Sequence, residues 1–194
     1  MARRPAVFID RDGTLTEEVG YVNHLSRLRL LPRAAAAVRR LNEAGIAAVV
    51  ATNQAGIARG YFSEDLMHAV HARLHDLLKE GGAHLDGLYV CPHHPTEGTP
   101  PFRSECECRK PKPGLLLRAA RDLDLDLAAS TMVGDKASDL LVAPAVGARA
   151  VLVLTGYGRG EWEHRRDHFS VLPDHVAGDL LDAVDWVMAR RRGA

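Results

Sequence analysis

Short apolar runs alternate with amphipathic segments along most of the chain. The run Ala6 to Asp10 ends in charge, and Ile46 to Thr52 repeats that pattern after a helical stretch near residues 32–44. This alternation is typical of a βαβ unit. The first quarter of the chain therefore predicts two parallel strands joined by a helix.

The same rhythm continues to the end of the chain. Ser63, followed by Glu64 and Asp65, is a plausible N-cap for a helix that reaches about Glu80, where two glycines stop it. Pro144 should kink or end the helix that follows Asp135. The other predicted elements are strands at 87–91, 131–133 and 150–154 and helices at 113–123 and 179–190.

The predicted strands are apolar at consecutive rather than alternating positions, which indicates a sheet that is covered on both faces. We therefore predict an α/β fold, a three-layer Rossmann-like parallel sheet with helices on both faces. A length of 194 residues with 46% hydrophobic content suits one core, so we expect a single domain over residues 1–194. A loop, a helix and a strand fill the chain between Asp12 and Thr52, which leaves no room for a cap domain.

Charge and the two ends of the chain argue against several classes of partner. Lys plus Arg and Asp plus Glu both number 25, so no basic field would attract nucleic acid or anionic lipid. The apolar stretch after Pro5 is too short for a signal peptide or a membrane span, so we expect a cytoplasmic protein. We expect it to be a monomer. We interpret Gly156 to Gly160 as a flexible connection and Arg190 to Ala194 as a frayed end.

Polar residues follow the predicted strands at the point where each strand ends. Ligands of open parallel sheets bind outside these carboxyl ends. The residues concerned are Asp10, Asp12, Thr52, Asn53, Gln54, Asp135, Lys136 and Asp139, with Arg109 and Lys110 between the third and fourth strands. We expect these side chains to meet at one edge of the sheet.

Three converging carboxylates, Asp10, Asp12 and Asp135, would repel one another unless a hard cation such as Mg²⁺ held them together. Hydrolysis of a phosphate monoester uses such a set. Asp10 would attack phosphorus and form an aspartyl-phosphate, and Asp12 would serve as general acid and then as general base. Thr52 and Lys110 would bind the transferring oxygens, and Asp139 would support the site.

A second metal site is predicted between residues 91 and 109. Cys91, Cys106, Cys108 and either His93 or His94 supply four ligands of the types that structural Zn²⁺ prefers, and an odd number of cysteines disfavours paired disulfides. Three further histidines, His68, His71 and His75, share one face of the 63–80 helix; we interpret that face as solvated rather than metal-binding.

The motifs together resemble the haloacid dehalogenase superfamily of aspartyl phosphatases over roughly residues 5–155. DRDGT at 10–14 matches its first motif, and its second aspartate is the form found in phosphatases. More narrowly, TNQAGIARG at 52–60, CPHHP at 91–95, CECRKP at 106–111 and VGDK at 133–136 resemble the D-glycero-D-manno-heptose-1,7-bisphosphate 7-phosphatase family. Lys112 and Pro144 depart from that family's pattern.

This resemblance implies removal of the 7-phosphate during heptose nucleotide synthesis for cell-surface polysaccharide. It also implies that His93 rather than His94 binds zinc, and that the partner is a small phosphorylated sugar. The residues it assigns to the substrate site are Arg11, Glu18, Val19, Gly20, Tyr21, Asn53, Gln54, Ala55, Arg109 and Lys136.

Two rival functions follow from the same sequence. Histidinol-phosphate phosphatases resemble this chain in both the aspartate motif and the zinc loop. A non-catalytic zinc-loop module that binds nucleic acid belongs to another class; zero net charge and the absence of interleaved basic and aromatic residues argue against it.

Overall fold

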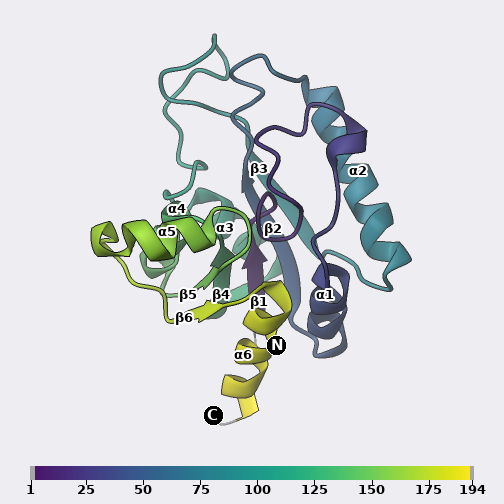
Figure 1. Cartoon of the computed structure of the whole chain (residues 1–194), viewed down its shortest axis with the longest axis vertical. Helices are drawn as coiled ribbons and strands as arrows, with labels where there is room; N and C mark the ends of the chain where they lie inside the picture. Colours follow the sequence, from purple (N-terminus) through teal and green to yellow (C-terminus); the bar gives the residue numbers. More distant parts are fainter. Residues whose placement is uncertain (1–2, 193–194) are drawn as a thin grey trace.

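A six-stranded parallel sheet forms the centre of the computed structural model, which describes residues 3–192 (Figure 1). Its strands stand in the order β3-β2-β1-β4-β5-β6. They are β1 (Arg4–Ile9), β2 (Ala47–Asn53), β3 (Gly87–Cys91), β4 (Leu125–Gly134), β5 (Arg149–Val153) and β6 (His175–Ala177). The chain thus builds outward from β1 through β2 to β3, then returns to the other side of β1 and builds outward again from β4.

Helices cover both faces of this sheet. They are α1 (Ala34–Glu43), α2 (Glu64–Glu80), α3 (Gly114–Leu123), α4 (Ala137–Val142), α5 (Gly158–Arg165) and α6 (Leu180–Arg192). Short 3-10 turns lie at Leu25–Arg27, Pro144–Val146 and Arg166–His168. The predicted three-layer fold is confirmed, and between β1 and α1 the chain holds a loop with one 3-10 turn in place of a cap domain.

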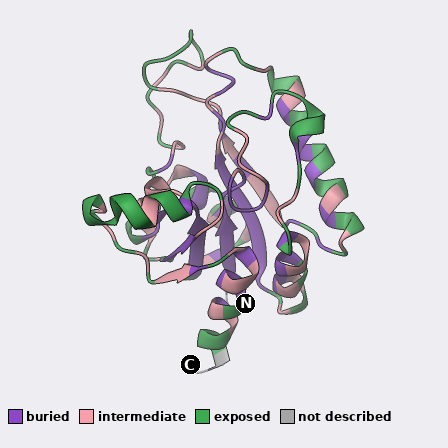
Figure 2. Ribbon diagram, in the orientation of Figure 1, coloured by how far each residue is buried: buried purple, intermediate pink, exposed green. Residues whose placement is uncertain are grey.

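Alternate residues of each central strand enter two different cores. Val7 and Ile9 pack with residues of α1, α2 and α6, whereas Ala6 and Phe8 pack with residues of α3 and α4. Because both sets are apolar, the strands read as continuous hydrophobic runs, as the sequence predicted. Figure 2 shows the result: buried strands, with exposure concentrated on the outer sides of the helices and on the loops above the sheet.

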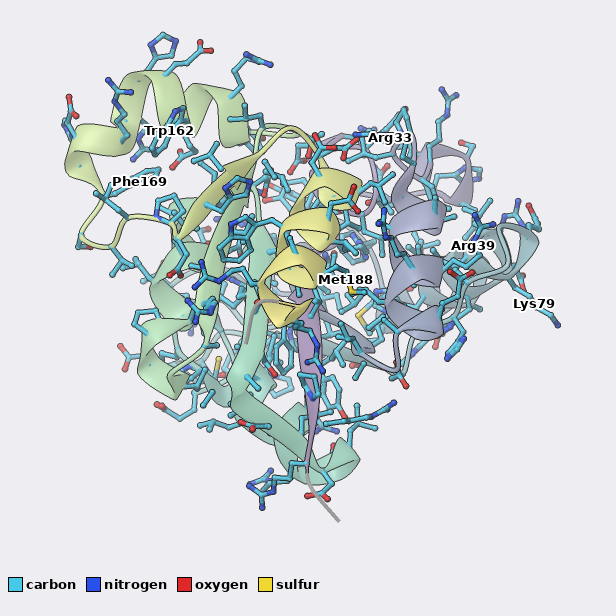
Figure 3. The ribbon with its side chains drawn as sticks, turned by 90° about the horizontal axis from the view of Figure 1, so that it is seen from below. Arg33, Arg39, Lys79, Trp162, Phe169 and Met188 are labelled. Atoms are coloured by element: carbon cyan, nitrogen blue, oxygen red, sulfur yellow. The ribbon has the colours of Figure 1, made fainter. Side chains whose placement is uncertain are left out.

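Helices α1 and α6 lie side by side on one face of the sheet, as Figure 3 shows from below. Ala183 and Val184 of α6 are fully buried there. Arg33, which directly precedes α1, bonds to Asp179 just before α6 and to Asp182 in its first turn. Since Arg33 is half exposed, these ion pairs contribute little, and the buried apolar residues hold the two helices together.

Three elements differ from the sequence prediction. Strand β4 spans Leu125–Gly134 rather than 131–133, because its partly exposed first half lacks a continuous apolar run. Gly156 to Gly160 is not a flexible connection, because α5 begins at Gly158. Strand β6 was missed because its three residues are too few for any periodicity to be read. The predicted end at Pro144 is confirmed, since α4 ends at Val142.

The predicted frayed tail is only partly described. Helix α6 continues through Arg190 to Arg192, and residues 193–194 lie outside the described part of the chain. Met1 and Ala2 lie outside it too. Within residues 3–192, no helix combines the length and apolarity that crossing a bilayer requires.

The sheet topology creates one natural place for a ligand. From β1 the chain moves toward β2, whereas β4 lies on the opposite side of β1, so the connections leaving these neighbouring strands diverge. Ligands of open α/β sheets bind at such a switch point, beyond the carboxyl ends of the strands. Asp10 follows β1 there and Asp135 follows β4.

Candidate active site

A buried lysine joins two aspartates at the switch point. The Nζ of Lys110 lies 2.8 Å from Oδ1 of Asp10 and 2.6 Å from Oδ1 of Asp139, and Lys110 is only 4% exposed. Burial opposes the charge on Lys110, but the two carboxylates raise its pKa above the ordinary lysine value. Lys110 is therefore a fixed positive charge beside the carboxylate of Asp10.

Three carboxylates, from Asp10, Asp135 and Asp139, have oxygens within 4.8 Å of one another. Burial, and then the charge of Asp10, raise the pKa of Asp135 to about 8. Burial also raises the pKa of Asp139 to about 6, against the opposing effect of Lys110. The lysine alone thus does not neutralise the cluster.

Two glycines from separate loops close over Asp135. A Cβ atom at Gly13 would come within 2.1 Å of Asp135 Oδ2, and one at Gly156 within 2.3 Å, so any other residue at either position would displace the carboxylate. Both glycines have positive φ, a conformation that other residues rarely adopt. The backbone N–H of Tyr157 donates to Asp135 Oδ2. These contacts fix the orientation of the Asp135 side chain.

The donor set fits a divalent cation that prefers oxygen. Within residues 3–192, Asp135 Oδ1 is buried without a hydrogen-bond partner. A buried carboxylate oxygen of this kind is costly unless a cation or a donor meets it. The cluster differs from the sequence prediction in one member: Asp139 stands beside Asp10 and Asp135, and the Asp12 carboxylate is held elsewhere.

Asp12 is held by Arg11 and Gln54. Arg11 donates from Nε to Asp12 Oδ1 at 3.0 Å and from Nη2 to Oδ2 at 2.8 Å, which is a two-pronged ion pair. Gln54 Nε2 donates to the same Oδ2 at 2.8 Å. Asp12 still borders the cavity above the cluster. Its carboxylate is therefore oriented by neighbours and open to a substrate.

Residues at the end of β2 complete the base of the site. Gln54 Nε2 donates to Thr52 Oγ1 at 2.9 Å, which leaves the hydroxyl proton of Thr52 available to a ligand. Asn53 exchanges two hydrogen bonds with the backbone of Lys110: its amide donates to the carbonyl, and its oxygen accepts from the N–H, both at 3.1 Å. Asn53 thereby fixes the loop that carries Lys110.

A cavity of about 340 Å³ opens above these groups. It brings together most of the residues predicted to bind substrate, namely Glu18, Gly20, Tyr21, Asn53, Gln54, Ala55, Arg109 and Lys136. Two others lie elsewhere: Arg11 is buried against Asp12, and Val19 packs on the core. A larger cavity of about 630 Å³ lies beside α6 at the opposite end of the strands and shares no residue with this one.

The sequence reasoning missed three residues of the cavity wall, Gly56, Ser138 and Tyr157. Tyr157 follows β5, so the rule that polar residues after strand ends gather at the site would have found it. Its ring lies 4.5 Å from the Nζ of Lys136, which also pairs with Glu18 at 3.1 Å. Lys136 thus links the loop after β1 to the loop after β5.

The second predicted metal site also assembles. Cys91 Sγ lies 3.6 Å from Cys106 Sγ, Cys106 lies 3.4 Å from Cys108, and His93 Nδ1 lies 3.4 Å from Cys108 Sγ. Sulfur atoms this far apart are not disulfide-bonded, since that bond is about 2.05 Å long. Ligands around one tetrahedral zinc would lie about 3.5–3.8 Å apart. The spacing is close to that of a four-ligand zinc site.

The histidine left open by the motif spacing is resolved by the backbone turn after β3. His93 enters the cluster. His94 faces away, where its Nδ1 accepts from the N–H of Glu97 at 2.9 Å. The same loop holds Arg109, which donates to the His93 carbonyl at 3.2 Å. The exposed Lys112 pairs with Glu107, so Lys110 is the lysine that reaches the carboxylates.

Comparisons with known proteins agree with this geometry. A family model described as HAD-hydrolase-like matches residues 107–183. A D-glycero-D-manno-heptose-1,7-bisphosphate 7-phosphatase of Thermosynechococcus vestitus is 48% identical over 188 residues, 95% of each chain. The D-glycero-beta-D-manno-heptose-1,7-bisphosphate 7-phosphatase of Escherichia coli is 46% identical over 154 residues, 78% of this chain and 80% of that protein. A solved D,D-heptose 1,7-bisphosphate phosphatase from B. bronchiseptica, complexed with magnesium and phosphate, has a TM-score of 0.83 at 32% identity and covers 96% of this chain and 99% of its own.

Proposed function

From the premise that this chain belongs to the haloacid-dehalogenase-like phosphatases, we propose that it hydrolyses the 7-phosphate of D-glycero-D-manno-heptose 1,7-bisphosphate. The observation that carries the chemistry is the Asp10–Lys110 pair at the end of β1, beside a buried carboxylate cluster. The relatives' names support the substrate, which is a small phosphorylated sugar.

Mg²⁺ is the proposed catalytic cofactor, and Asp10 and Asp135 are the residues that would hold it, with Asp139 beside them. When bound, the cation would lower the repulsion between the attacking carboxylate and the phosphate dianion. The unpartnered Asp135 Oδ1 supports this assignment. The Asp12 carboxylate stands outside this cluster, because Arg11 and Gln54 hold both of its oxygens.

In the first step, Asp10 attacks phosphorus. Lys110 occupies Oδ1 of Asp10, so Oδ2 is the oxygen that forms the new bond to phosphorus. The ester P–O bond breaks, and the leaving sugar oxygen takes a proton from Asp12, which therefore enters this step protonated and leaves it as the carboxylate that pairs with Arg11. Thr52 and Lys110 donate hydrogen bonds to the oxygens of the transferring group, which gain negative charge from the attack.

In the second step, water regenerates the enzyme. Asp12, now ionised, takes a proton from the water, whose oxygen attacks phosphorus and breaks its bond to Asp10. Inorganic phosphate leaves, and the carboxylate of Asp10 and the proton on Asp12 are restored. One group therefore serves as acid and then as base, which requires that its orientation stays the same in both steps.

Arg109 is the proposed anchor for the phosphate that is not cleaved. It lines the cavity, and its planar fork suits two-pronged phosphate binding. Arg109→Ala should lower kcat/KM for the heptose bisphosphate by about 10- to 100-fold, the worth of a lost charged hydrogen bond, and should barely change kcat/KM for an aryl monophosphate. Steady-state kinetics on both substrates measure the difference.

The matched control for this prediction is Arg121→Ala, which removes an exposed arginine on α3. It should leave both substrates unaffected. If Arg109→Ala reduced turnover of the two substrates equally, Arg109 would belong to the reacting phosphate and would no longer support a bisphosphate substrate.

We propose that zinc is structural. The four protein ligands would fill a tetrahedral shell, and the loop they close carries Arg109 and Lys110. Cys106→Ser should reduce bound zinc from about one equivalent to a small fraction and lower activity indirectly. Metal analysis of the washed protein measures the zinc.

The control for Cys106→Ser is Glu105→Gln, an exposed change on the same loop that should retain zinc and activity. Full zinc content together with normal activity in Cys106→Ser would overturn the four-ligand assignment. Activity of the wild-type protein should depend on added magnesium, and not on added zinc.

Histidinol-phosphate phosphatase is the rival that shares both motifs. A panel in Mg²⁺ that contains both anomers of the heptose bisphosphate, histidinol phosphate and an aryl phosphate separates the two functions. We expect the highest kcat/KM with a heptose bisphosphate. A higher value with histidinol phosphate would favour the rival. Absence of turnover on every substrate would favour the non-catalytic zinc-loop module.

A further inference from the structure

Arg11 is one of the most deeply buried charged residues in the described part of the chain. Only 1% of it is exposed, although it lies next to the cavity. A buried guanidinium is unfavourable unless its N–H groups find partners and its charge is paired. The guanidinium of Arg11 must therefore be hydrogen-bonded and paired with an opposite charge.

The guanidinium has three partners. Toward the cavity it donates to both oxygens of Asp12, as described above. The nitrogen Nη2 also donates to Gln54 Oε1 at 2.9 Å. On the opposite side, its Nη1 lies 3.1 Å from Nε2 of His71 in helix α2. His71 thus contacts Arg11 on the side away from the cavity, and Arg11 directly precedes Asp12 in the sequence.

The direction of the bond between Arg11 and His71 follows from their chemistry. Arginine can only donate, so His71 Nε2 must be the acceptor and the ring proton must sit on Nδ1. Burial, and then the charge of Arg11, lower the pKa of His71 to about 3. The imidazole is therefore neutral and remains an acceptor throughout the pH range in which proteins work.

This arrangement corrects the sequence interpretation of the helix histidines. His68 and His75 are exposed as expected, but His71 is only 7% exposed. Its neighbours along the helix, Val70 and Leu74, are buried in the core. Because α2 is fixed by that packing, the position of His71 is fixed as well.

We propose that His71 is a positioning residue: it holds the guanidinium of Arg11 in the plane of the Asp12 carboxylate and thereby fixes the direction in which Asp12 transfers its proton. The proposal rests on the phosphatase function proposed above and assigns to α2 a part in that reaction. His71 itself touches neither the substrate nor the reacting atoms.

The geometry explains why a third contact is needed. The carboxylate and the guanidinium could swing together as one planar unit about the side-chain bonds of Arg11. The His71 bond ties the far side of that unit to α2. Proton transfer is sensitive to distance and angle, so a small rotation of Asp12 makes it a less effective general acid. Loss of the His71 acceptor would also leave Nη1 of Arg11 buried without a partner.

The test compares His71→Gln with His71→Leu. The amide oxygen of glutamine can reach roughly where Nε2 lies and can accept from Arg11, whereas leucine cannot accept. His71→Asn is a second variant without that contact, because its shorter side chain ends before Nε2; it replaces His71→Leu should the latter fail to fold. His68→Gln and His75→Gln are controls on the exposed side of α2.

The readout is kcat/KM across phosphate esters whose leaving groups range from 4-nitrophenol to a simple alcohol. This parameter reports the steps up to departure of the leaving group, and a poor leaving group depends most on the acid. We expect His71→Leu to lose about 10- to 100-fold on the alkyl phosphate, part of what general acid catalysis contributes, and little on 4-nitrophenyl phosphate. His71→Gln and both controls should match the wild type.

An equal loss across the series, or no loss in His71→Leu and His71→Asn, would overturn the positioning role of His71. A general loosening of the fold would lower turnover of all the esters alike and would not steepen the dependence on the leaving group. Failure of the proposed function is distinguishable, since it would appear as wild-type protein that cleaves none of the esters.

Discussion

Asp10→Asn protein should release phosphate no faster than the buffer background, with its fold intact. Asparagine keeps the size of the side chain but replaces the attacking carboxylate oxygen with a neutral amide. Removal of a catalytic nucleophile can cost on the order of 10⁶ in kcat. Lys110 keeps its ion pair with Asp139, so the buried ammonium is not left alone. Phosphate release in Mg²⁺ measures the loss.

Thermal unfolding of the same sample shows whether the fold survives, and Asp122→Asn on α3 is the control for an aspartate-to-asparagine change outside the site. We expect Asp122→Asn to be fully active. Substantial turnover by folded Asp10→Asn protein would contradict the aspartyl-phosphate mechanism.

Asp12→Asn should separate the two halves of the reaction. An amide can neither protonate the leaving group nor accept a proton from water, so kcat on an alkyl phosphate should fall by about 10²- to 10⁴-fold. With 4-nitrophenyl phosphate, the leaving group departs without an acid, whereas hydrolysis of the phosphoenzyme still lacks its base. We therefore expect a burst of about one equivalent of nitrophenol, followed by slow turnover.

Rapid mixing measures this burst, and Asp10→Asn is its control, because a protein without the nucleophile should give none. An unchanged rate in Asp12→Asn would mean that another group is the acid. Loss of turnover with no burst would leave Asp12 necessary for the first step even when the leaving group needs no proton.

The strand pattern predicted most of the fold because buried parallel strands are apolar at every position. Helix α5 escaped prediction because Gly156, Gly158 and Gly160 suggested flexibility. In the structure, a Cβ at Gly158 would come within 1.7 Å of the Val153 carbonyl oxygen, so this glycine satisfies a close contact. A single sequence does not distinguish a glycine needed for packing from one that gives mobility.

The residues of the candidate site that lie at strand ends were predictable from the sequence. Asp10 and Asp135 follow strands that the apolar runs identify, and Thr52 lies in the last two residues of another. The choice between Asp12 and Asp139 for the third carboxylate of the cluster was not predictable, because it depends on the side-chain direction that Arg11 imposes on Asp12.

The burial of His71 was predictable from its spacing in the helix. With Leu74 and Leu78 it forms an i, i+3, i+7 stripe, which is the buried stripe of α2. Three histidines on roughly one face suggested a uniform solvated surface. At about 100° per residue, however, His71 stands about 40° to 60° around the helix from His75 and His68, on the edge of the buried stripe. What the stripe could not reveal was the partner, since Arg11 comes from a loop sixty residues away in the sequence.

We propose that this enzyme removes the 7-phosphate and leaves the 1-phosphate in place. The most direct measurement follows D-glycero-D-manno-heptose 1,7-bisphosphate by ³¹P NMR in the presence of the protein and Mg²⁺. We predict that the resonance of the 7-phosphate disappears as inorganic phosphate grows, while the anomeric 1-phosphate resonance persists. Loss of the anomeric phosphate, or an unchanged spectrum under conditions in which histidinol phosphate is hydrolysed, would contradict the account.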